Sequence, residues 1–217
     1  MIWVTGDTHG DWIHRVNMDS FPEQREMSKD DYVIILGDFG IWRDSPQQRW
    51  YLNWLEEKHF TTLFIDGNHE NYDILDSYPV EEWHGGKVHF IKPSIIHLMR
   101  GQVFEIDDLK FFTFGGAASH DISDGVLEID DPRVKEWRDD PDKMYRINHI
   151  SWWEREMPNQ KEMNEGIKNL AEHNNKVDFI LTHCIASSTA ALLSHGLYKP
   201  DKFCLLYTSP SPRDGLL

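Results

Sequence analysis

Apolar residues gather in short runs along this chain, and four of the runs stop where metal-competent side chains begin. Residues 2–5, 32–36 and 62–66 have the length and composition of buried strands. They lead into Gly6-Asp7-Thr8-His9-Gly10, Gly37-Asp38-Phe39-Gly40 and Gly67-Asn68-His69-Glu70, and a later run, residues 177–182, ends at His183. Because open α/β sheets place ligands at the carboxyl ends of their strands, we expect these polar groups to share one site.

Helical patterns separate the early strands. Residues 11–18 form a short helix in this prediction, and Ser45 caps a second one, in which Gln48 completes a capping box and Trp50, Trp54 and Leu55 form the apolar face. The order β-α-β-α-β favours a parallel sheet with right-handed crossovers. We therefore expect an α/β fold.

The second half of the chain follows a different pattern. Short apolar segments at 88–91, 95–99, 102–106 and 110–114 are joined by tight turns, which predicts an antiparallel second sheet. Residues 121–156 are polar and match no element clearly. Asn159 then begins a helix with Glu162 at the capping-box position, and its predicted apolar face consists of Met163, Ile167, Leu170 and Ala171.

Composition narrows the function classes. A length of 217 residues favours one large domain, and the formal net charge of −15 argues against a general nucleic-acid binder and against attraction to anionic membranes. Two cysteines imply no disulfide framework. Neither a signal peptide nor an apolar segment of about 20 residues is visible, so we expect a cytoplasmic protein with no membrane partner. The oligomeric state is not determined by the sequence.

The polar groups at the strand ends suit a divalent metal. Asp7 and His9 are two residues apart, so an extended segment points both side chains the same way. Asp38 adds a carboxylate, Asn68 a carbonyl oxygen and His183 an imidazole. This mixture of oxygen and nitrogen donors fits Mn²⁺, Fe, Zn²⁺ or Co²⁺ and can hold two cations roughly 3.5–4 Å apart.

These motifs, in order, resemble the first four motifs of the calcineurin-like metallophosphoesterases, in particular the small bacterial and phage-type members. The resemblance covers residues 1 to 203 and implies a sandwich of two mixed β-sheets flanked by helices. It implies that Asp7 and His9 bind one metal, that Asp38 bridges, and that Asn68 and His183 bind the second, with Mn²⁺ the leading expectation. His69 would be catalytic, stabilising the phosphoryl oxygens and protonating the leaving group while a metal-bridging hydroxide attacks phosphorus.

Two positions depart from the family pattern. The fifth motif, Gly-His-x-His, is absent among the twelve histidines, and the Asp that protein phosphatases carry three residues after the bridging Asp is Ile41. Residues 204–214 resemble the in-frame translation of a transposase adapter used in sequencing libraries. We therefore expect a C-terminally truncated domain over residues 1–203, a non-native disordered tail over 204–217, and weaker activity than a chain with the fifth motif.

The predicted function is hydrolysis of phosphate mono- or diesters by a metal-dependent phosphoesterase, with a small-molecule or nucleotide substrate. Trp152, His120 and Asp121 are candidate substrate-binding residues, although paired tryptophans such as Trp152 and Trp153 commonly anchor a loop to the core. The alternatives are a scaffold protein on the same fold, which retention of Asp38, Asn68 and His69 argues against, and a nuclease of the same family, which the acidic surface argues against. The identity of the substrate stays open.

Overall fold

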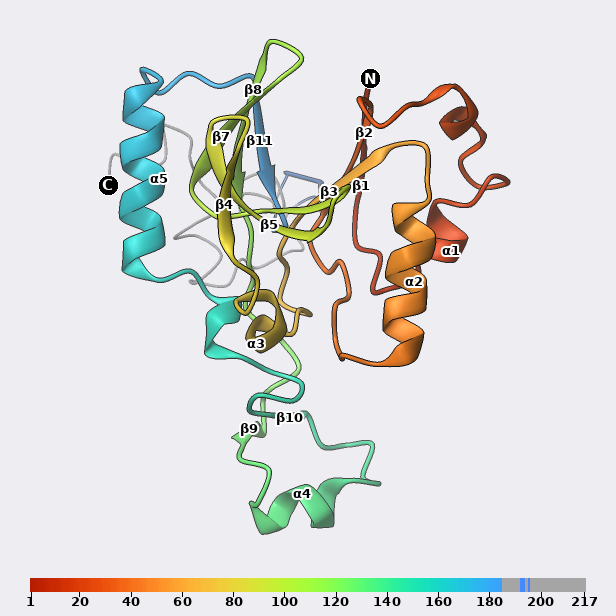
Figure 1. Ribbon diagram of the computed structural model, residues 1–217. Coiled ribbons are helices and arrows are strands. Elements are labelled where there is room, and N and C mark those ends of the chain that lie inside the picture. Colours follow the sequence, from red (N-terminus) through yellow and green to blue (C-terminus); the bar gives the residue numbers. More distant parts are fainter. Residues whose placement is uncertain (185–191, 194, 196–217) are drawn as a thin grey trace.

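The computed structural model describes residues 1–184, 192, 193 and 195 (Figure 1). The predicted tail, residues 204–217, and the end of the domain predicted over residues 1–203 lie outside the described residues. No helix in the described part has both the length and the apolar composition needed to cross a membrane.

Two β-sheets lie back to back between helices. Helix α5 (Gln160–Glu172) covers one side, and α1 (Trp12–Arg15) and α2 (Pro46–Glu56) cover the other (Figure 1). Each sheet contains both parallel and antiparallel pairs. The expected sandwich of two mixed sheets flanked by helices is confirmed.

The larger sheet has six strands in the order β1-β2-β3-β6-β5-β4. Strands β1, β2, β3 and β6 run parallel, and β5 and β4 continue the sheet in antiparallel pairs. Their bounds are β1 Ile2–Thr5, β2 Tyr32–Leu36, β3 Thr61–Ile65, β4 Val80–Trp83, β5 Gly86–Lys92 and β6 Ile95–Leu98. The three N-terminal strands lie within a residue of the positions that the apolar runs predict.

The smaller sheet corrects one part of the prediction. Its order is β11-β8-β7, built from β7 (Gln102–Ile106), β8 (Leu109–Phe114) and β11 (Phe179–Thr182). Strands β5 and β6 were expected in this sheet, but β6 pairs with β3 instead. Every residue of β6 is buried, as a strand inside a sheet that is covered on both faces requires, and a local hairpin pattern does not reveal that partner.

Alternating side chains divide the interior into three apolar layers. On β2, Val33 and Ile35 pack toward the α1 and α2 side, whereas Ile34 packs between the two sheets. Phe111 and Phe112 on β8 point in opposite directions in the same way, Phe111 into the layer between the sheets and Phe112 toward α5. This period of two is the geometry of a strand that is buried on both faces.

Helix α2 differs from its prediction in which face it buries. Ser45 accepts the backbone N–H of Gln48 at 3.1 Å, so the predicted cap is present. The Gln48 side chain does not complete the capping box, because its Nε2 donates to the carbonyl of Gly40 at 3.1 Å. Trp50 is 57% exposed, and Leu52 and Leu55 are the buried residues, so the predicted stripe is rotated.

Helix α5 has the predicted capping box between Asn159 and Glu162. The prediction of its apolar face is partly wrong. Met163 and Leu170 pack against the smaller sheet as predicted, but Ile167 is 66% exposed and Ala171 is also exposed. Gly166 is the buried residue of the helix and lies close to the backbone of Gly101, so this close approach sets how the helix is turned.

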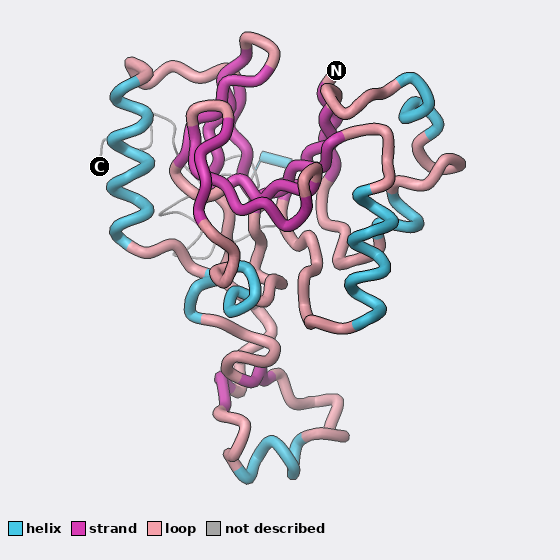
Figure 2. The backbone as a smooth tube through the Cα atoms, viewed as in Figure 1, coloured by secondary structure: helices cyan, strands magenta, loops and turns pink. Residues whose placement is uncertain are grey.

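Residues 121–156 form an arm that projects from the body of the molecule (Figures 1 and 2). The arm contains β9 (Gly125–Leu127), α4 (Pro132–Trp137) and β10 (Tyr145–Ile147), with β9 and β10 paired in parallel. The remaining short elements of the described chain are α3 and two 3-10 turns, with bounds α3 Tyr72–Leu75, η1 Pro22–Glu26 and η2 Glu154–Glu156. Trp153 donates its indole N–H to Asp73 of α3 at 2.8 Å, which fastens the base of the arm to the body.

Candidate metal centre

The four strand ends that the sequence singled out meet in one place. Asp7 and His9 follow β1, and Asp38 follows β2. One ligand atom from each of these three side chains lies within 4.8 Å of the other two. His9 Nε2 lies 3.9 Å from Asp7 Oδ2 and 3.5 Å from Asp38 Oδ2. Three potential ligand atoms from two strands are therefore brought within the reach of one cation.

The second half of the centre is formed by His183 and Asn68. His183 Nε2 lies 3.5 Å from Asp38 Oδ1 and 3.3 Å from Asn68 Oδ1. His183 Nδ1 lies 2.8 Å from the carbonyl oxygen of Leu36, so Nδ1 carries the proton and donates there. The lone pair of Nε2 thus faces two oxygen acceptors, an arrangement that a cation stabilises and that is unfavourable without one.

Asp38 lies between the two halves, with Oδ2 toward His9 and Oδ1 toward His183. Its backbone is held in the left-handed region at φ 47°, and its Oδ1 accepts the backbone N–H of His69 at 2.8 Å. Glu70 supports the same loop, because its two carboxylate oxygens accept the backbone N–H groups of Phe39 (2.6 Å) and Gly40 (3.1 Å). Burial raises the pKa of Glu70 to about 8, against the effect of these two donors.

Two glycines are needed for steric reasons. A side chain at Gly37 would collide with the His183 ring, and one at Gly67 would collide with the Asp38 carboxylate. Gly37 also has φ 88°, a conformation that glycine adopts without strain. The glycines that follow β2 and β3 therefore each make room for a ligand that arrives from another strand.

A family model of calcineurin-like phosphoesterases matches residues 1–185. The chain belongs to this family. The match covers every strand of the two sheets and all six residues that the sequence predicts as ligands or catalytic. Comparison with curated proteins and with solved structures gave no match.

Membership in the calcineurin-like phosphoesterases indicates metal-dependent hydrolysis of phosphoesters, and the group Asp7, His9 and Asp38 is consistent with it. The roles assigned to individual residues stay predictions. The side chains nevertheless fit the divalent metals of such enzymes, since oxygen and nitrogen ligand atoms converge on both oxygens of Asp38.

His69 lies at the edge of this centre. Its ring meets that of His9 edge to face, with the centroids 5.2 Å apart, and its backbone carbonyl accepts the indole N–H of Trp42 at 2.9 Å. Burial lowers the pKa of His69; Asp38 opposes this effect, and the positive charge of Arg146 adds to it.

The position at which protein phosphatases of this family carry an aspartate is occupied by Ile41, which is 2% exposed and belongs to the core. The negative charge of Asp121, in the arm, acts on His69 and raises its pKa, against the overall shift. Arg146 on β10 donates to Asp121 through Nε at 3.0 Å and to the carbonyl of Ser151 at 3.2 Å. Asp121, predicted as a substrate residue, is thus part of an ion pair beside His69.

The other two predicted substrate residues lie differently. His120 is exposed and makes no hydrogen bond or ion pair with any described residue. Trp152 is half-buried, and its indole N–H has no hydrogen-bond partner among the described residues. Its neighbour Trp153 anchors the arm to the body, which is the common role of paired tryptophans.

Sequence reasoning missed a hydrogen-bonded chain that holds Asn68. The amide Nδ2 of Asn68 donates to Ser119 Oγ at 3.3 Å, and that hydroxyl donates to Glu156 at 2.7 Å. Glu156 also accepts the backbone N–H of Ser119 at 2.8 Å. The sequence shows Ser119 in the loop after β8 and Glu156 three residues after Trp153, but nothing in it indicates that these two residues are in contact.

A buried ion pair beneath Gly67 was also missed. Asp66 and Arg100 are 1% and 5% exposed, and Arg100 Nε donates to Asp66 at 2.7 Å. Tyr72 joins them, because its hydroxyl lies 3.0 Å from Asp66 and 2.8 Å from Arg100. The Arg100 guanidinium and His97 hold the pKa of Asp66 well below its usual range in spite of burial. This network fixes the strand end from which Asn68 and His69 project.

Proposed function

We propose that this chain hydrolyses phosphate mono- or diesters with two divalent cations bound on either side of Asp38. The observation that carries the proposal is the position of the Asp38 carboxylate, whose two oxygens face His9 and His183 at 3.5 Å each. A carboxylate placed in this way suits a bridging ligand. Asp7 and His9 would complete one site, and Asn68 and His183 the other.

The donor types favour Mn²⁺, with Fe, Zn²⁺ or Co²⁺ as alternatives, since all of them accept mixed oxygen and nitrogen ligands. When bound, such cations supply a hydroxide nucleophile at neutral pH and positive charge for the phosphoryl oxygens. The net charge of −15 supports a small phosphoester or nucleotide as substrate rather than a nucleic acid.

His69 is the proposed catalytic residue of the chain itself. An imidazole at the rim of the centre can donate a hydrogen bond to a phosphoryl oxygen, and in its protonated form it can pass a proton to the departing alcohol oxygen. Asp38 fixes the position of His69, because the backbone N–H of His69 donates to the same carboxylate that would hold both cations. Substrate orientation and metal position are therefore coupled through one residue.

The test uses the chain stripped of metal with EDTA. Mn²⁺ binding is measured by calorimetry, and hydrolysis of 4-nitrophenyl phosphate and of bis(4-nitrophenyl) phosphate is followed with and without Mn²⁺. The proposal expects Mn²⁺-dependent hydrolysis that EDTA abolishes, and loss of both binding and hydrolysis in Asp38→Asn. Asp108→Asn, in the exposed turn between β7 and β8, is the matched control. Absence of hydrolysis with Mn²⁺, Fe²⁺, Zn²⁺ and Co²⁺ alike would overturn it.

A further inference from the structure

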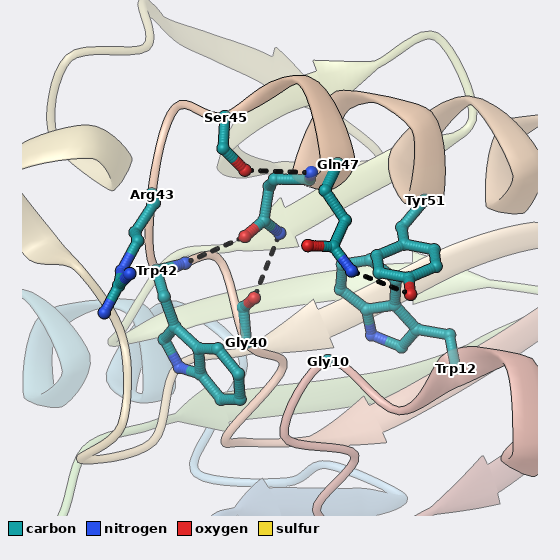
Figure 3. A pocket seen from close by; sticks show the side chains of 9 residues that line it. Gly10, Trp12, Gly40, Trp42, Arg43, Ser45, Gln47 and Tyr51 are labelled. Carbon is teal, nitrogen blue, oxygen red and sulfur yellow. Dashed lines mark hydrogen bonds between the residues drawn. The ribbon is translucent and has the colours of Figure 1, made fainter.

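A pocket of about 240 Å³ lies beside the metal centre (Figure 3). Gly10, which follows His9 directly, and Gly40, two residues after Asp38, are among the residues that line it. The loops that carry two predicted ligands therefore form part of its wall. Neither the family match nor the proposed chemistry assigns this pocket a role.

Trp42 provides a flat and immobilised surface in the pocket. Its indole N–H donates to the carbonyl of His69 at 2.9 Å, and its ring lies against Gly10, which has no side chain to displace it. The side chain is nonetheless 42% exposed. An indole that is anchored at its nitrogen and open on one side is suited to stacking with a planar ring.

Some polar side chains of the pocket hold its wall together, and others are available to a ligand. Gln48 belongs to the wall, since its side chain donates to the carbonyl of Gly40 and accepts the backbone N–H of Trp42. Gln47 and Tyr51 are hydrogen-bonded to each other, with 3.2 Å between Gln47 Nε2 and the phenol oxygen (Figure 3). The guanidinium of Arg43, which also lines the pocket, makes no hydrogen bond or ion pair with any described residue, and it points away from Gln47 and Tyr51 (Figure 3).

We propose that this pocket binds the planar ring of the substrate's alcohol part, a nucleobase or a simple aryl group, while the phosphoryl group lies at the metal centre. This rests on the proposed function. The volume lies below the roughly 300–1,000 Å³ of pockets for drug-sized ligands, so it suits one ring system and is too small for a folded peptide or an oligonucleotide. Trp42 stacks on the ring, and the Gln47–Tyr51 pair contacts its polar edge.

The first experiment needs neither metal nor turnover. Saturation-transfer difference NMR is recorded on metal-free protein with adenosine, 4-nitrophenol and ribose as separate probes. Saturation of ring protons of adenosine or 4-nitrophenol is expected, weak or absent transfer to ribose is expected, and Trp42→Ala is expected to remove the ring signal. Trp42→Phe, which keeps a ring, retains part of the signal, and Trp137→Ala, a tryptophan on α4 of the arm outside the pocket, changes nothing.

The two probes distinguish the two sources of the ring. Transfer to adenosine alone assigns the pocket to nucleotides, transfer to 4-nitrophenol alone assigns it to simple aryl esters, and transfer to both supports a general ring site. Transfer to neither, or transfer that Trp42→Ala leaves unchanged in a folded variant, overturns the proposal. Circular dichroism establishes the fold of each variant.

The second experiment uses Mn²⁺-loaded protein. The ratio to be measured is kcat/KM for 4-nitrophenyl phosphate, which bears a ring, divided by kcat/KM for glycerol 2-phosphate, which does not. Trp42→Ala should lower this ratio by about tenfold, as expected for loss of one stacking contact. An equal loss on both esters overturns the pocket assignment. If no ester is hydrolysed, the proposed function fails, and the NMR result alone decides whether the pocket binds a ring.

Discussion

Asn68 and Ser119 are joined by a hydrogen bond of 3.3 Å from the amide nitrogen to the serine hydroxyl. The bond fixes which end of the Asn68 amide faces the metal centre, because the nitrogen is used by Ser119 and the oxygen is left for His183. Glu156 in turn holds the serine. A ligand on the larger sheet is thus oriented by the base of the arm, about 90 residues away in the sequence.

We expect Ser119→Ala to weaken Mn²⁺ binding by roughly 10- to 100-fold, since the partners that orient metal ligands have effects of this size. Titration calorimetry on metal-free protein measures it. Ser123→Ala, an exposed serine on the same loop, is the control and should bind Mn²⁺ as the unchanged chain does. Equal affinities in the two variants would show that Asn68 does not need this partner.

His69→Asn should separate catalysis from metal binding. We expect kcat to fall by roughly 10²- to 10⁴-fold, the range for loss of a general acid, while the affinity for Mn²⁺ changes little. The reason is that His69 lies against His9 through its ring and reaches Asp38 only through its backbone N–H, which the substitution keeps. His59→Asn, an exposed histidine just before β3, at the opposite end of that strand from His69, serves as control. If Mn²⁺ binding were lost with activity, His69 would be a ligand.

Arg100→Met should destabilise the fold by about 3–5 kcal/mol, because it leaves the buried Asp66 carboxylate without its cation. Urea unfolding followed by tryptophan fluorescence gives the free energy of unfolding. Arg49→Met removes an exposed ion pair with Asp44 and should cost no more than about 1 kcal/mol. A similar small loss for Arg100→Met would mean that the buried network is not needed for stability.

The stability of the chain should fall as the pH falls from 6.5 toward 4. Burial lowers the pKa of His89 from 6.5 to about 4, helped by His97, whose Nδ1 lies 3.1 Å from His89 Nδ1. Between these two values the unfolded chain binds a proton that the folded chain does not, so acid favours unfolding. The shift corresponds to about 3 kcal/mol at most.

Urea unfolding at pH 7.0, 6.0, 5.0 and 4.5 measures this dependence. The slope of unfolding free energy against pH over this range should be smaller in His89→Asn than in the unchanged chain, because the substituted side chain does not titrate. Other groups also titrate over these values, so the difference between the two slopes is the decisive quantity. Identical slopes would assign the acid sensitivity elsewhere.

The sequence by itself determined the N-terminal strands and the site that they carry. Residues 32–36 and 63–65 are apolar at successive positions, which is typical of a strand covered on both faces. The glycines that follow allow the chain to turn sharply, and the residues after them have the donor types of a metal centre. Local rules of this kind located each strand end. The tendency of α/β sheets to gather ligands at the carboxyl ends of their strands then predicted Asp7, Asp38 and His183 as neighbours.

Only the tertiary structure decided where β6 pairs, how α2 and α5 are turned, and which residues support the ligands. Strand β6 lies beside β3, Gly166 sets the packing of α5, and Ser119 and Glu156 reach Asn68. Each of these depends on a partner far away in the sequence. An apolar pattern predicts that a residue is buried, but it does not indicate which other residues cover it. The choice of partner is made by packing of the whole chain, where close approach and hydrogen bonding select one arrangement among several with the same local pattern.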